Sequence, residues 1–189
     1  ERTDVTDAQV RRLADRAVDE ATDALRPFGY YAPAVRSRTS RDDDSWVVRL
    51  TIAPGEPVRM QQVDVRVTGP GADERELTSI AEASVLQPGA RLDHAAYERL
   101  KSDLLRTALG LGYLDATLTR RELLVDPPAL TASAAIELET GGRYRFGEVR
   151  VEQDVIDDAL LQRYVRFVPG RTYSVDSMRS TQYALEDSN

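Results

Sequence analysis

The stretch LGLGYLDATLTRREL, from Leu109 to Leu123, joins a helical pattern to an alternating one through a Gly-Tyr pair. Upstream of it, apolar residues recur at helical spacing from Tyr97 to Leu111, which predicts a helix that Asp93 caps and Gly112 ends. Downstream, alternation predicts a strand over 114–124. This helix, Gly-Tyr and strand junction decides the fold because the chain contains it twice.

The first copy of the junction is LRPFGYYAPAVRSR, from Leu25 to Arg38. Residues 7–25 carry one apolar face and predict a helix, with Thr6 and Gln9 spaced as a capping box. Strands are predicted over 31–39 and 46–53. The polar stretch RDDDS between them is typical of a turn, so the two strands form a hairpin.

A complete unit is predicted between Val58 and Thr140, in the order strand, helix, helix, strand, strand. Its first strand covers 58–67, and a short helix follows around Leu77 and Ile80. The Pro88-Gly89 turn separates that helix from the longer one described above. The unit closes with the strand over 114–124 and another over 131–139, split by VDPP.

The same order begins again at Arg143. FGEVRV at 146–151 repeats the pattern of MQQVDV at 60–65, and FVPGRTYSVDSM at 167–178 repeats LQPGARLDHAAY at 86–97. A strand over 143–153, a short helix with Ile156, Leu160 and Tyr164, and a helix with Val175, Met178 and Leu185 are therefore expected. A period of about 80 residues makes each repeat a small domain with its own core.

Three modules follow from these repeats, with an α+β fold. Module 1 spans 1–57 and is expected to lack its first strand and first helix, module 2 spans 58–142 and is complete, and module 3 spans 143–189 and stops inside its second helix. The short linkers at 54–57 and 140–143 predict limited articulation between modules.

Repeats of this β-α-α-β-β order resemble POTRA domains. The stretches that carry the resemblance are LRPFGYY, APGEPVRM, LQPGARLDHAAYERLKSDLL, LGLGYLDATL and GGRYRFGEVRVE. They are similar to the POTRA region of the TamA family of outer-membrane assembly factors, with BamA-like proteins as the nearest alternative. The resemblance implies that each module is a mixed three-stranded sheet with two helices packed on one face.

The resemblance also implies a role in outer-membrane biogenesis in a Gram-negative bacterium. It implies a periplasmic protein-interaction region that serves β-barrel assembly, autotransporter assembly or protein translocation. The implied partners are a TamB-like periplasmic protein, unfolded outer-membrane clients and a C-terminal β-barrel that is absent from this sequence. Two alternatives stay open: the POTRA region of a two-partner secretion transporter, and a rigid periplasmic spacer that binds no client.

The composition excludes several other classes of protein. The 189 residues have a net charge of −7 and no basic run longer than a pair, which argues against nucleic acid as a partner. With no cysteine, the sequence cannot form disulfides, thiolate zinc sites or a cysteine nucleophile. There is no membrane-spanning apolar run and no leader at the start, so any signal peptide is expected to precede this chain.

Neither an enzyme nor a cofactor site is expected. His94 is the only histidine and no second His or Cys completes a metal site with it. The three aspartates of RDDDS lack the alternation of a calcium loop, which favours a solvated turn. The Gly-x-Gly of GLGYL closes a helix rather than opening one, which argues against a dinucleotide site.

The candidate interaction sites are the strands that follow the second helix of each module, because the POTRA arrangement puts such strands at a sheet edge. An edge exposes backbone N–H and C=O groups to which an extended partner can pair. The candidate contacts are Val35, Arg36 and Arg38 in module 1, and Thr117, Thr119 and Arg121 in module 2. A purely structural role is expected for Gly29, Tyr30, Gly112, Tyr113, Pro88, Gly89, Pro169 and Gly170.

Overall fold

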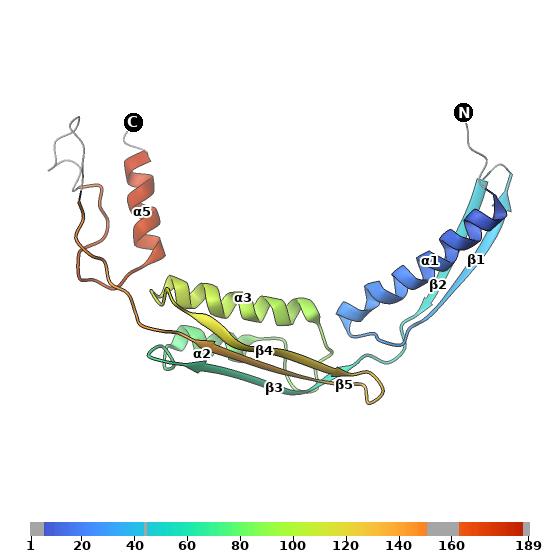
Figure 1. Ribbon diagram of the computed structural model, residues 1–189, viewed down its shortest axis with the longest axis horizontal. Helices are drawn as coiled ribbons and strands as arrows, with labels where there is room; N and C mark the ends of the chain where they lie inside the picture. Colours follow the sequence, from blue (N-terminus) through green and yellow to red (C-terminus); the bar gives the residue numbers. More distant parts are fainter. Residues whose placement is uncertain (1–5, 44, 151–162, 187–189) are drawn as a thin grey trace. The chain divides into compact units, whose positions relative to one another are not determined.

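The computed structural model describes residues 6–43, 45–150 and 163–186 (Figure 1). It is a mixture of helices with one two-stranded and one three-stranded sheet. No helix in these ranges is both long and apolar enough to span a bilayer. In chain order, the elements are α1 (Asp7–Leu25), the 3-10 turn η1 (Arg26–Phe28), β1 (Ala34–Asp42), β2 (Ser45–Ala53), β3 (Arg59–Thr68), α2 (Arg75–Ala83), α3 (His94–Gly110), β4 (Thr117–Asp126), β5 (Thr131–Glu139) and α5 (Val175–Glu186).

The chain divides into two compact units. The first comprises residues 1–63, 85–98 and 123–134, and the second comprises residues 64–84, 99–122 and 135–189. The division passes through the three-stranded sheet and α3, and not through the linkers between the modules. Boundaries at 57 and 142 therefore stay a prediction.

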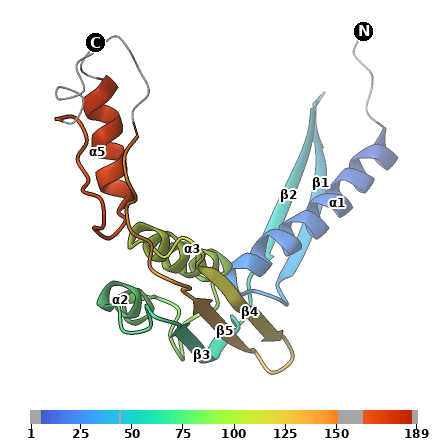
Figure 2. The ribbon, with the colours of Figure 1, turned by 60° about the vertical axis from the view of Figure 1, so that its left-hand side comes forward.

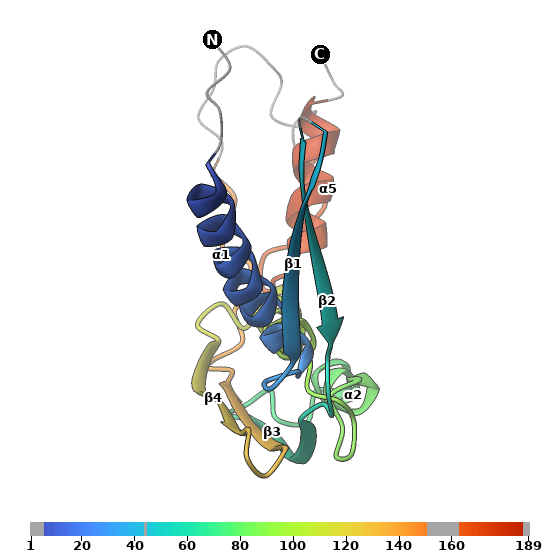
Figure 3. The ribbon, with the colours of Figure 1, turned by 90° about the vertical axis from the view of Figure 1, so that its right-hand side faces the viewer.

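In the first unit, α1 lies along the hairpin of β1 and β2 (Figures 1 and 3). The predicted capping box is present, with the Thr6 side chain accepting from the Gln9 backbone and the Gln9 side chain accepting from the Thr6 backbone. Val10 and Ala14 are buried on the face that packs on the hairpin. β1 and β2 pair antiparallel in one unbroken register.

The three-stranded sheet has the order β3-β5-β4, so β4 is an edge strand as expected. Arg59 N donates to Leu130 O (2.9 Å) and Thr140 N donates to Thr68 O (3.1 Å), so β3 and β5 run parallel. β4 and β5 are joined by a short turn and run antiparallel, which makes the sheet mixed. Helices α2 and α3 lie over one face of this sheet (Figure 2).

That face carries the core of the complete module. Alternate residues of β5 are buried, because one side of the strand meets the helices and the other side does not. Helix α3 turns Leu104 and Ala108 to the interior, and the helix spacing predicted this. The largest fully buried side chains are Met60, Leu77, Leu86, Leu92, Leu104, Ile136, Leu138, Val58 and Thr140.

The prediction of a strand over 143–153 is wrong for residues 143–150. These residues form no strand, and Arg145 makes only an isolated bridge to Thr172. A strand requires a neighbour, and the described residues of module 3 include no counterpart of β5. Residues 151–153 and most of the predicted short helix, with Ile156 and Leu160, lie outside the described residues. Tyr164, at the end of that helix prediction, lies in a turn.

Candidate functional site: module junctions and sheet edges

Gly29 ends the first helical segment in the left-handed conformation, with φ of +86°, as expected for a helix C-cap glycine. Its carbonyl accepts from Val58 N (2.8 Å), and the Val58 carbonyl accepts from Leu92 N (2.9 Å). Three segments far apart in the sequence are thus joined by backbone hydrogen bonds. Gly29 is required because a Cβ there would lie 2.7 Å from Leu92 O.

Gly112 makes the same junction in the second unit, with φ of +93°. Its carbonyl accepts from Tyr144 N (2.8 Å), and the Tyr144 carbonyl accepts from Tyr173 N (2.9 Å). A Cβ on Gly112 would lie 2.9 Å from Tyr173 O. The repeated Gly-Tyr of the sequence therefore marks a repeated junction, and each junction lies inside one compact unit.

The two Pro-Gly turns belong to these junctions. Gly89 N donates to Met60 O and Gly170 N donates to Phe146 O, each at 2.7 Å. The guanidinium of Arg59 donates to Gly89 O, and that of Arg145 donates to Gly170 O, each at 2.9 Å. Sequence reasoning missed both arginines, although each precedes the repeated apolar pattern at the same place.

At the first junction, Tyr30 is held by Arg91. The guanidinium lies 5.6 Å from the ring centroid and donates to the hydroxyl at 3.3 Å. Next to it, Tyr31 Oη lies 2.9 Å from Nε2 of His94. Burial raises the pKa of Tyr31, and Arg26 partly offsets this. The single histidine thus contacts a tyrosine of module 1.

At the second junction, Tyr113 is buried and donates to Oε1 of Glu74 at 2.8 Å. Arg143 donates to the same oxygen at 2.8 Å, and its guanidinium lies 5.4 Å from the Tyr113 ring centroid. Burial is the largest cause that raises the pKa of Tyr113, followed by the hydrogen bond to Glu74. The second junction thus contains the Arg143–Glu74 ion pair. The Tyr30–Arg91 contact at the first junction, in contrast, includes no carboxylate.

The module 2 candidates lie together on the edge strand β4. Thr117, Thr119 and Arg121 are all exposed, and their alternate positions put them on one face. The Thr119 hydroxyl donates to Glu137 O (3.4 Å) of the central strand β5. The structure therefore brings these three predicted residues onto one edge.

The module 1 candidates are divided between the two faces of β1. Val35 is half-buried on the face that meets α1, and Arg36 and Arg38 are exposed on the opposite face. Arg38 lies directly opposite Arg49 of β2 in the register. The sequence prediction omitted Arg49, although pairing the two predicted strands around the RDDDS turn would have revealed it.

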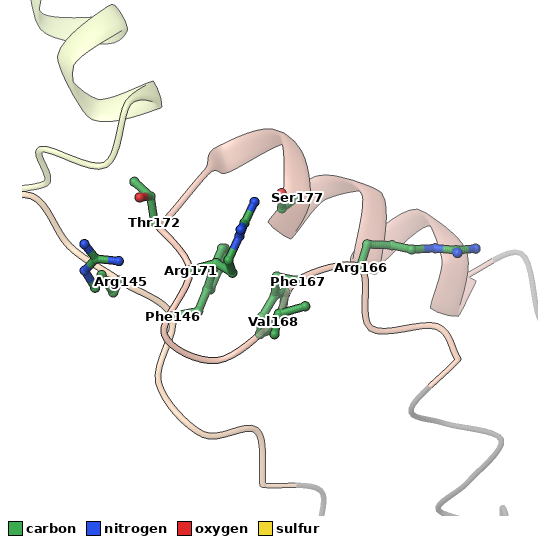
Figure 4. A pocket seen from close by; sticks show the side chains of 8 residues that line it. All are labelled: Arg145, Phe146, Arg166, Phe167, Val168, Arg171, Thr172 and Ser177. Atoms are coloured by element: carbon green, nitrogen blue, oxygen red, sulfur yellow. The ribbon is translucent and has the colours of Figure 1, made fainter. Parts of the chain in front are cut away.

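A hollow of about 610 Å³ lies beside the second junction (Figure 4). Phe146 and Phe167 stack in its wall, with ring centroids 4.2 Å apart. Arg145 and Arg166 lie on opposite sides of it, and Arg171 lies between them (Figure 4). Within the described ranges, no three His, Cys, Asp or Glu side chains gather closely enough to hold a metal ion.

Comparison with known protein families finds a match for the first part of the chain. Residues 1–54 match the family model described as POTRA domain, TamA domain 1. This match covers α1, the 3-10 turn and the β1–β2 hairpin.

Comparison with solved structures extends the likeness over most of the chain. POTRA3-5 of BamA from Haemophilus influenzae is similar with a TM-score of 0.53 and 15% identity, over 90% of this chain and 69% of that one. POTRA1-3 of Omp85 from Anabaena matches at 14% identity, 92% and 71% coverage and a TM-score of 0.37. The N-terminal domain of Omp85 from Thermosynechococcus elongatus matches at 15% identity with a TM-score of 0.39, over 91% of this chain and 71% of that one. The first of these likenesses shows the fold, and the other two score too low to add to it.

Proposed function

We propose that this chain is a periplasmic POTRA region of a TamA- or BamA-like protein, and that it docks extended partner segments at its sheet edges. The match of residues 1–54 to a TamA POTRA model and the fold shared with BamA POTRA3-5 support this. The partners are a TamB-like periplasmic protein and unfolded outer-membrane protein clients. The segment would pair with the backbone of β4 in module 2 and of β1 in module 1. No catalytic step or cofactor is part of this proposal.

The observation that carries the proposal is the free edge of β4. Among the described residues, this strand pairs only with β5, and Thr117, Thr119 and Arg121 along it are exposed. Backbone hydrogen bonds depend little on sequence, so one edge can accept many different strands. Short polar side chains at Thr117 and Thr119 leave room for a neighbouring strand.

Strand addition at β4 can be tested by hydrogen exchange measured residue by residue. The probe is a peptide of alternating apolar and polar residues, which is the pattern of a transmembrane β-barrel strand. In an antiparallel pair, the amides of alternate residues point to the same side. Added peptide should therefore slow exchange at every second amide of β4, on the side away from β5.

The control is β5, which has a strand on both sides. Its amides should exchange at the same rate with and without peptide. Uniform slowing along β4, or slowing only on α2 and α3, would contradict strand addition. A photoreactive residue placed at Thr117, Thr119 and Arg121 in the full-length protein should then form adducts in cells, whereas one at Glu137 on β5 should not.

The second candidate function is a rigid spacer, and the junctions favour it. Each junction is a chain of backbone hydrogen bonds through Gly29 or Gly112, which restricts the link between successive modules. A spacer requires such links but no free edge. It predicts that the barrel-strand peptide changes exchange nowhere on the chain, which separates it from the docking proposal.

A further inference from the structure

Three arginines form a cluster on the outward face of the β1–β2 hairpin, the face opposite α1. Arg36 and Arg38 lie two residues apart on β1, and Arg49 of β2 faces Arg38 directly. All three are exposed, as is every other residue on this face of the hairpin. We call Arg36, Arg38 and Arg49 the arginine face.

The arginine face has no anionic partner of its own among the described residues. Some arginines elsewhere among the described residues do have one, such as Arg16 with Glu20 (2.8 Å) and Arg120 with Glu122 (2.8 Å). The chain contains 32 acidic residues against 25 basic ones, so carboxylates are abundant. Like charges directly opposite on a sheet are destabilising. The cluster thus has an electrostatic cost that a bound anion would relieve.

The spacing fits carboxylates on an extended chain. Arg36 and Arg38 are separated by about 7 Å along β1, which is the spacing of alternate side chains on any extended segment. Guanidinium groups bind carboxylates through two parallel hydrogen bonds. Val47, 40% exposed on the same face, adds an apolar contact beside the charges.

We infer that the arginine face binds an extended acidic segment of a partner polypeptide. This deepens the proposed interaction role and rests on it. Lipid headgroups fit less well, because membrane-binding clusters usually contain about four to eight basic residues.

The test is a fluorescence anisotropy titration of the 189-residue chain against a labelled peptide of alternating Glu and Thr. The same peptide with Gln in place of Glu should not bind. Binding of the Glu peptide should weaken as salt rises from about 0.05 to about 0.3 M, because exposed charges are screened. The variant R36Q/R38Q/R49Q should bind about tenfold more weakly, since three individually weak ion pairs are lost together.

The matched control is R11Q/R12Q/R99Q, which removes the same charge from exposed positions on α1 and α3. Its affinity should stay within about twofold of the unsubstituted chain. Equal loss in both variants, or no loss in the arginine-face variant, would overturn the inference. The inference would also be overturned if phosphatidylglycerol vesicles bound the chain through these arginines and the Glu peptide did not bind. Failure of strand addition would appear instead as unchanged amide exchange in β4, so the two ideas can fail separately.

Discussion

At the scale of single residues, Gly29 is the position where the chain tolerates least change. In Gly29→Ala, the alanine must adopt a positive φ. Its Cβ would also lie 2.7 Å from the carbonyl oxygen of Leu92, which would have to move. We expect the free energy of unfolding to fall by about 2–3 kcal/mol. Urea denaturation followed by circular dichroism measures this.

Two other glycines separate the causes of that loss. Gly89 also has a positive φ (+85°), but a Cβ there would meet nothing within 4 Å, so Gly89→Ala should cost only about 1 kcal/mol. Gly110 is helical with equally open surroundings, and Gly110→Ala should be neutral or stabilise by about 0.5 kcal/mol. If all three variants lost the same stability, the close approach to Leu92 would not matter.

Tyr113 makes the second junction sensitive to alkaline pH. Its pKa is raised in the folded chain from an ordinary value of 10.0, so folding favours the neutral phenol. Its contribution to stability is complete below pH 10 and is lost as pH rises through the folded pKa. Between about pH 9 and 11.5, the unfolding temperature of the unsubstituted chain should fall more steeply than that of Tyr113→Phe. Parallel curves for the two proteins would contradict this.

At the scale of elements, the arginine face makes a prediction about the hairpin alone. Arg38→Gln removes the like charge opposite Arg49 and should stabilise the chain by about 0.2–1 kcal/mol. Arg36→Gln is the control, because Arg36 faces the neutral Thr51 and should change stability less. Thermal unfolding of both variants at low salt checks the difference. A loss of stability in Arg38→Gln would mean that the arginine supports the fold by packing.

Periodicity predicted most elements because most of them have one buried face. α3 and β5 are the clearest cases, with helical and strict alternation that match their buried residues. β1 begins at Ala34 and not at Tyr31, because Tyr30 and Tyr31 are used in the first junction. The strand expected at 143–153 failed in its described part because its sequence pattern carries no information about whether a partner strand is present.

The candidate sites were only partly predictable, because a local sequence pattern shows which residues share a face but not which distant residues meet. Alternation alone put Thr117, Thr119 and Arg121 on one face of β4. The same alternation puts the adjacent Val35 and Arg36 on opposite faces of β1, so the module 1 candidates do not share one surface. The Glu74–Arg143 pair joins residues that are 69 apart in sequence, and no local pattern reveals it.

At the scale of the whole molecule, the second junction should control how tightly modules 2 and 3 are connected. Glu74→Gln removes the charge that Arg143 and Tyr113 share. The amides of Tyr144 and Tyr173, which cross the junction, should then exchange several-fold faster. Glu76→Gln, an exposed change in the first turn of α2, the helix that Glu74 precedes, should leave both rates unchanged. Equal acceleration in both variants would point to general loosening.

The backbone link from Gly29 through Val58 to Leu92 has a consequence for protein engineering. A donor fragment cut at residue 57 would leave the Gly29 carbonyl without its donor and remove the turn that packs against it. A fragment that continues through Leu92 would keep the whole hydrogen-bonded link. Chimeras of such modules should therefore be spliced between the two helices of a module, where a linker-based map of the sequence would not place the cut.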